Sequence, residues 1–312
     1  MSENKTTPFT YNSYEMIRRK FDEARGISDR RLQELWQQGI LLEEDLILIG
    51  FLYRLTYLTG HLIDECFWLP GVEQKFKRLP KANGKSAYTK AIRRLEQYGV
   101  IETLQRTDDD GAWKGQHIYK LTSGAYIWYT TYYHRFNICD KNVPFAILSQ
   151  AVLRPDNSIT DEEILEIMSL NQHLIRSISR HGMNLLSHYR FFLNRRTAAN
   201  FVEDANDNWI LVLSVKGQID AAREKAMRYL VTQWIDSTER VRRKGYILIL
   251  TDDLSTASSY WSLVDQSYHR RMLFATDYSV YAEGPFQYLI RFKTGTEYEK
   301  LSLNFTDSEE EK

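Results

Sequence analysis

Residues 85–98 combine side chains that can hydrogen-bond to a nucleic acid with the spacing of an amphipathic helix. On a helical wheel at about 100° per residue, Tyr88, Ala91, Ile92 and Leu95 fall on one side. The opposite side is polar and basic. Arginine and lysine can address guanine edges in a major groove, glutamine can pair with adenine, and serine and threonine can bind phosphates or bases. We therefore predict that this helix contacts duplex DNA through Lys85, Ser86, Thr89, Lys90, Arg93, Arg94 and Gln97.

Basic charge is concentrated around this helix in a chain that is neutral overall. Residues 71–106 hold nine basic and three acidic residues, whereas the whole chain has 41 of each kind. Local positive charge of this kind releases counterions from a phosphate backbone. The alternative interpretation is a solvated basic face without a partner.

The elements around the helix predict a winged helix-turn-helix over residues 41–125. Apolar residues recur at three- to four-residue spacing from Leu46 to Tyr57, and His61–Trp68 follows as a short second helix. Gly99 closes the helix of residues 86–98 as a left-handed cap. Residues 100–106 and 117–121 then form a hairpin around the turn at residues 108–111. The three aspartates of that turn would repel phosphates, so we expect its tip to stay off DNA or to contact a protein.

A second domain is expected over residues 146–305, with an α/β pattern. Strand-like runs at 188–193, 209–215, 246–250, 272–275 and 288–292 alternate with amphipathic helices at 218–243 and 255–268. Residues 1–40 are expected to form a partly disordered and partly helical extension, and residues 306–312 an acidic tail. The aromatic segment 126–145 is interpreted as a packing helix or a linker strand, with a buried interdomain or dimer surface preferred.

The composition does not favour a metal site, a disulfide-linked fold or a membrane span. Cys66 and Cys139 form no CxxC motif, and no histidines stand at metal-ligand spacing, so we expect no metal and no other cofactor. The cysteine usage fits a reducing, cytoplasmic compartment. The apolar stretch 46–63 contains Arg54 and His61, which predicts a buried helix of a water-soluble protein without a membrane partner.

Two neighbouring aspartates follow the apolar run of residues 246–250. Asp252 and Asp253 stand where α/β sheets place functional carboxylates, at the carboxyl end of a strand. They also directly precede a helix that begins near Ser255, and we favour capping of that helix as their role.

Three motifs of the first domain together resemble a known family. These are residues 57–67 (YLTGHLIDECF), 86–102 (SAYTKAIRRLEQYGVIE) and 117–124 (HIYKLTSG). In order and spacing they are similar to the winged-helix half of the replication-relaxation family of plasmids and other mobile elements. The resemblance covers about residues 41–125. It implies a C-terminal domain like a degenerate PD-(D/E)XK nuclease core, which is a restriction-endonuclease-like α/β fold.

A nuclease of that class needs carboxylates that hold Mg²⁺ near a scissile phosphate, and a lysine beside them. The matching position here is residues 214–216, where Lys216 is present and Ser214 replaces the acidic residue. Asp204 or Asp207 would supply the upstream acid. With a single carboxylate at the metal, we expect no hydrolysis. The alternative role of Lys216 is a strand-end residue whose amine extends to solvent.

The sequence thus predicts an α+β protein that binds double-stranded DNA sequence-specifically without being an enzyme. We expect it to act in the replication, transfer, maintenance or transcription of a mobile element, as a homodimer that reads two half-sites. Replication or transfer proteins are further expected partners. Two alternatives stay open: a Mg²⁺-dependent DNA nuclease that uses Asp204 and Lys216, and a protein-interaction adaptor that uses the winged helix.

Overall fold

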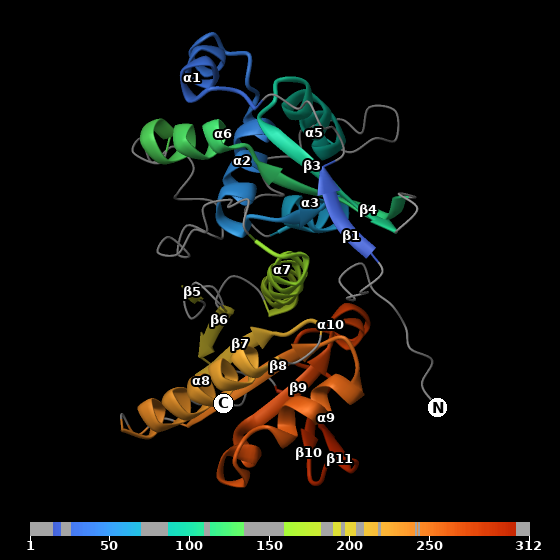
Figure 1. The fold of residues 1–312 in the computed structure, drawn as a ribbon. Coiled ribbons are helices and arrows are strands. Elements are labelled where there is room, and N and C mark those ends of the chain that lie inside the picture. Colours follow the sequence, from blue (N-terminus) through green and yellow to red (C-terminus); the bar gives the residue numbers. More distant parts are fainter. Residues whose placement is uncertain are drawn as a thin grey trace, which may run out of the picture. The chain divides into compact units, whose positions relative to one another are not determined.

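Helices and strands are both present in the computed structural model, in a four-stranded and a seven-stranded sheet (Figure 1). The chain divides into two compact units between Asp161 and Glu162. The structure describes residues 15–19, 26–69, 87–108, 113–133, 159–181, 190–194, 197–203, 209–217, 220–240, 242 and 244–303. None of the helices in these ranges is long and apolar enough to cross a membrane.

The N-terminal unit contains helices on a small antiparallel sheet with the strand order β1-β3-β4-β2. Its strands are β1 (Glu15–Arg19), β2 (Leu58–Thr59), β3 (Ile101–Asp108) and β4 (Trp113–Leu121). Its helices are α1 (Asp29–Gln37), α2 (Glu43–Leu55), α3 (Gly60–Phe67), α5 (Ala87–Gln97), α6 (Ser123–Trp128) and the π-helical turn η2 (Tyr129–Tyr133).

A short strand, β2, lies between the first two helices of the predicted winged helix-turn-helix, α2 and α3. Helix α2 ends at Leu55, and Leu58–Thr59 pairs antiparallel with Ile118–Tyr119 of β4. Thr59 then accepts a hydrogen bond from the Leu62 amide as the N-cap of α3. Gly99 has a positive φ of 67°, so its predicted left-handed conformation at the end of α5 is confirmed.

The N-terminal extension is partly a strand, where the sequence predicted a helix. Residues 15–19 form β1, which pairs antiparallel with β3 from Glu15↔Asp108 to Arg19↔Leu104. Pairing with an open sheet edge decides the conformation of such a short segment, and local helix propensity does not. Residues 29–37 are helical as predicted, with Ser28 accepting a hydrogen bond from Arg31 as the N-cap.

The described part of the aromatic segment, residues 126–133, packs inside the N-terminal unit. Trp128 and Tyr129 are both buried. The Trp128 indole donates a hydrogen bond to Gln33 of α1, and the Tyr129 ring lies 4.4 Å from that of Tyr53 in α2. This segment is therefore a packing helix of the unit, and residues 134–145 lie outside the described part of the chain.

The C-terminal unit is a mixed sheet with the strand order β11-β10-β9-β8-β7-β6-β5. Its strands are β5 (Arg190–Asn194), β6 (Thr197–Glu203), β7 (Trp209–Ser214), β8 (Gly245–Thr251), β9 (Met272–Thr276), β10 (Leu289–Phe292) and β11 (Tyr298–Leu301). Its helices are α7 (Asp161–His181), α8 (Ala221–Arg240), α9 (Leu254–Ser262), the 3-10 helix η6 (Gln266–Arg271) and α10 (Asp277–Ala282).

The centre of this sheet is parallel, because helices connect successive strands. Strands β7, β8 and β9 run in the same direction, with α8 and α9 as the crossovers (Figure 1). Alternate residues of these strands, such as Leu213, Ile249 and Phe274, share a buried core with Val231 of α8 and Ala257 of α9. The predicted strand–helix–strand pattern is confirmed here, and it brings the carboxyl ends of β7, β8 and β9 to one edge of the sheet.

Candidate functional site

The predicted DNA-reading helix has the expected division between an inner and an outer face. Helix α5 exposes Lys90, Arg93 and Gln97 to solvent. Thr89 is half-buried on the same helix. The inner face packs in the unit through the buried residues Ala91, Ile92 and Leu95.

Arg94 has a different role from the DNA contact that we predicted for it. Its guanidinium makes two hydrogen bonds of 2.7 Å to the Asp45 carboxylate and one of 3.0 Å to Glu44. Asp45 is fully buried and also accepts a hydrogen bond from the Leu42 amide at the start of α2. Burial raises the pKa of Asp45, and the Arg94 hydrogen bonds oppose that rise. Arg94 therefore joins α5 to α2, because a buried carboxylate needs a paired charge.

Several predicted residues lie outside the described part of the chain. These are Lys85 and Ser86 before α5, residues 109–111 of the predicted turn, and Asp204 and Asp207 of the nuclease interpretation.

Lys216, just after β7, is the most unusual charged residue of the C-terminal unit. Its side chain is fully buried, so the interpretation of an amine that extends to solvent is wrong. The ammonium group makes an ion pair of 2.7 Å with Asp252 and a second, short one with Asp277. Burial opposes the charge of Lys216, but the two carboxylates outweigh it and raise the lysine pKa.

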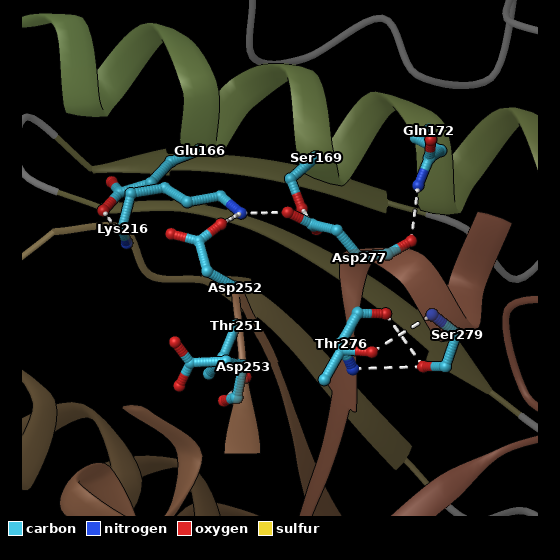
Figure 2. Close-up of polar contacts among 10 residues, drawn as sticks. All are labelled: Glu166, Ser169, Gln172, Lys216, Thr251, Asp252, Asp253, Thr276, Asp277 and Ser279. Carbon is cyan, nitrogen blue, oxygen red and sulfur yellow. Dashed lines mark hydrogen bonds and ion pairs between the residues drawn. The ribbon is translucent and has the colours of Figure 1, made fainter. Parts of the chain in front are cut away.

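Both aspartates follow the neighbouring parallel strands, as Figure 2 shows. Asp252 comes directly after β8, and its neighbour Asp253 caps α9 through a 2.7 Å hydrogen bond from the Thr256 amide. The predicted capping role is thus confirmed for Asp253, whereas Asp252 binds Lys216. Asp277 comes directly after β9, beside the N-cap Thr276 of α10. Three consecutive strand ends therefore supply the lysine and its two carboxylates.

Helix α7 contributes polar groups one turn apart, and they point toward these strand ends (Figure 2). Ser169 donates a short hydrogen bond to Asp277, and Gln172 donates one of 3.2 Å to the Asp277 carbonyl. Glu166 accepts a 3.0 Å hydrogen bond from the Lys216 amide. Glu166, Ser169 and Gln172 thus join α7 to the edge of the sheet.

Glu166 is a carboxyl group whose pKa lies near neutral pH. Burial raises its pKa from 4.5 to about 7, while the Arg223 guanidinium and the Lys216 hydrogen bond oppose that rise. Arg223 of α8 lies 3.4 Å from Glu166 and also donates to the Lys216 carbonyl. A carboxyl group with this pKa can exchange a proton at pH 7.

The positions of the nuclease interpretation are described only in part, because Asp204 and Asp207 lie outside the described residues. Within the described part of the chain, no group of three or more histidine, cysteine, aspartate or glutamate side chains could hold a metal ion. Ser214 stands at the acidic position of the motif, and the Lys216 ammonium is engaged by Asp252 and Asp277. The residues of Figure 2 therefore hold the buried ammonium of Lys216, and the titratable carboxyl of Glu166 lies beside it.

Sequence reasoning missed Glu166 and Asp277 as partners of the Lys216 region. Asp277 had a usable signal, since it follows an apolar strand in the same way as Asp252. The only sequence signal for Glu166 was its place on an amphipathic helix. Its role depends on the packing of α7 against the strand ends, which is a tertiary contact that the sequence pattern does not reveal.

Comparison of the chain with protein-family models, with curated proteins and with solved structures found no match.

Proposed function

We propose that this protein binds double-stranded DNA through the exposed face of α5. The observation that carries the proposal is the exposure of Lys90, Arg93 and Gln97 along one side of a helix whose other side is buried. These positions span two helical turns, which is the length over which a recognition helix contacts base edges in a major groove.

The order of elements supports this assignment. Helix α2, strand β2, helices α3 and α5, and then the hairpin β3–β4 follow one another along the chain. A winged helix-turn-helix has this order, and in that fold the last helix before the hairpin enters the groove. We accordingly propose that the N-terminal unit is a winged helix-turn-helix, with β1 as an additional edge strand.

The distribution of charge supports a local DNA-binding surface on the N-terminal unit. It does not favour general binding of the chain to polyanions. The chain is neutral overall, and Arg94 is engaged by two acidic side chains of α2. Lys90 and Arg93 are then the cations of the described α5 face that reach solvent. The motifs that resemble the replication-relaxation family extend the proposal to sequence-specific control of a plasmid or other mobile element, by a homodimer on two half-sites.

The test is equilibrium binding of the full chain to DNA fragments selected from its native genome. We expect the double variant Lys90→Ala and Arg93→Ala to lose at least ~10-fold in affinity, since base and phosphate contacts of Arg and Lys each contribute about 1–3 kcal/mol. Gln97→Ala should lower the preference for the selected site over random duplex.

The matched control is the pair Arg228→Ala and Lys225→Ala, which removes the same charges from the exposed side of α8. We expect it to bind like the wild type. Equal losses in both double variants would show that only total charge matters. Unchanged binding in the α5 variant would exclude α5 as the interface.

A further inference from the structure

A cavity of about 280 Å³ lies in the C-terminal unit, at the end of β7 between helices α7, α8 and α9. Its polar lining includes Glu166, Ser214, Arg223 and Tyr260, and its apolar lining includes Met227 and Leu230. Cavities that bind small molecules have this composition, with apolar walls and a few convergent polar groups.

One end of the cavity is buried and the other is open. Ser214 is 2% exposed, Tyr260 is 1% exposed and Glu166 is 7% exposed. Asp220, at the start of α8, is exposed, and Glu163 of α7 is half-buried. The neutral or titratable groups thus form the deep end, and two carboxylates stand toward the entrance.

Two hydroxyl groups at the deep end lack a hydrogen-bond partner among the described residues. They are Ser214 Oγ and Tyr260 Oη. An unpaired buried hydroxyl costs about 1–3 kcal/mol, so a ligand that accepts hydrogen bonds from both groups would gain affinity here. The guanidinium of Arg223 contacts Glu166 and the Lys216 carbonyl through Nη1, and it also interacts electrostatically with Tyr260.

The deep end therefore offers donors. The arginine is always protonated, each hydroxyl can donate, and Glu166 can donate from its second oxygen when it carries its proton. Such a set fits an acceptor group that is negatively charged. The carboxylates at the entrance disfavour a dianion, and Met227 and Leu230 along the wall favour an apolar body.

We propose that this cavity is a binding site for a small monocarboxylate with an apolar body, whose carboxylate meets Arg223, Ser214 and Tyr260. The volume of about 280 Å³ lies at the small end of the range of ligand pockets, so the ligand must be small. The site is separate from the α5 face and does not depend on DNA binding.

Binding should take up a proton at Glu166. The groups that act on this carboxyl are Glu163 on its own helix, the amide and the ammonium of Lys216 after β7, Arg223 of α8 and Tyr260 of α9. A ligand anion near these groups favours protonated Glu166, because two carboxylates in contact cannot both stay ionised. The affinity should therefore weaken severalfold between about pH 6 and pH 8.

The probe is benzoate, with benzamide as its neutral analogue and phenylphosphonate as a more highly charged one. Titration of the full chain, followed by saturation-transfer NMR, should give a benzoate dissociation constant of ~1 mM or tighter. We expect weaker binding of both analogues. Arg223→Met should weaken benzoate more than ~10-fold, since it removes a charge-assisted hydrogen bond. Arg228→Met on the same helix is the control and should bind like the wild type.

Ser214→Ala separates a ligand contact from a structural role. The loss of one hydrogen bond should weaken benzoate about fivefold, while the thermal stability of the ligand-free protein stays equal or rises. Ala226→Phe, which fills the cavity, should abolish binding in a protein that still folds. The proposal is overturned if benzoate shows no saturable binding, if benzamide binds equally well, or if Arg223→Met and Ser214→Ala leave the affinity unchanged.

Discussion

A single buried lysine organises the carboxyl edge of the parallel strands. Lys216 is fully buried, and its ammonium is balanced by Asp252 and Asp277. A buried charge is stable only when it is paired and hydrogen-bonded, and Ser169 supplies a further hydrogen bond to Asp277. The cluster therefore fixes the positions of β7, β8, β9 and α7 relative to one another.

Removal of the lysine charge should be strongly destabilising. Lys216→Met keeps the length of the side chain but leaves two carboxylates without their cation, so we expect a loss of about 3–5 kcal/mol in the free energy of unfolding. Urea unfolding at pH 7 measures this loss. Lys225→Met, at an exposed position of α8, is the control and should change stability by no more than ~0.5 kcal/mol. A loss below ~1 kcal/mol for Lys216→Met would contradict the assigned ion pairs.

Glu166 predicts a specific dependence of stability on pH. Its pKa is raised from 4.5 to about 7 in the folded protein, so between these values the native state holds a proton that the unfolded chain has released. The free energy of unfolding must then fall as pH rises through this window, by on the order of 3 kcal/mol in total. Glu166→Gln carries no titrating proton and should lose this decrease.

The measurement is urea unfolding of the wild type and of Glu166→Gln at several pH values from about 4.5 to 8. The difference between the two curves isolates Glu166. Glu283→Gln, at an exposed position after α10, should follow the wild type. Parallel curves for the wild type and Glu166→Gln would show that this carboxyl titrates normally.

The sequence indicated which charged residues are unusual, but it did not indicate which residues they contact. Lys216 and Asp252 could be singled out because each follows an apolar strand. Their ion pair joins residues 36 positions apart, and the partner Asp277 is 61 positions away. Arg94 was placed on the outer face by the helical wheel, but the wheel contains no information about Asp45, which is 49 residues distant.

At the scale of elements, α5 presents two arginines in succession with separate roles. Arg93 is exposed, whereas Arg94 is hydrogen-bonded to the buried Asp45 of α2. Successive residues of a helix point in directions about 100° apart. Arg93 therefore faces solvent, whereas Arg94 faces the neighbouring helix α2.

The two arginines should therefore separate stability from binding. Arg94→Ala leaves Asp45 buried without its cation, and we expect a loss of about 2 kcal/mol in the free energy of unfolding. Arg93→Ala should stay within ~0.5 kcal/mol of the wild type and weaken DNA binding instead. Urea unfolding and DNA titration of both variants check this. If Arg94→Ala left stability unchanged, the α2–α5 contact would not be formed.

Strongly periodic elements were predictable and short ones were not. The long amphipathic helix α8 and the apolar strand β8 follow directly from their patterns. Strands β1 and β2 have five and two residues, and their conformation depends on edge pairing with β3 and β4. Such pairing joins distant segments, so no local pattern reveals it.

At the scale of the whole molecule, a neutral chain carries its basic charge in a restricted segment. Residues 71–106 hold nine basic residues against three acidic ones, and the exposed cations of α5 belong to this segment. The proposed function requires that these cations replace counterions on the phosphates of a duplex. Binding by the full chain in solution must therefore depend on salt concentration.

The salt dependence of duplex binding tests this claim most directly. The logarithm of the binding constant of the full chain should fall linearly with the logarithm of salt concentration. For the double variant Lys90→Ala and Arg93→Ala the slope should be shallower by roughly 2, since about 0.9 counterions are released per phosphate contact. Identical slopes for the wild type and this variant would contradict the account, because α5 would then make no contact with the phosphate backbone.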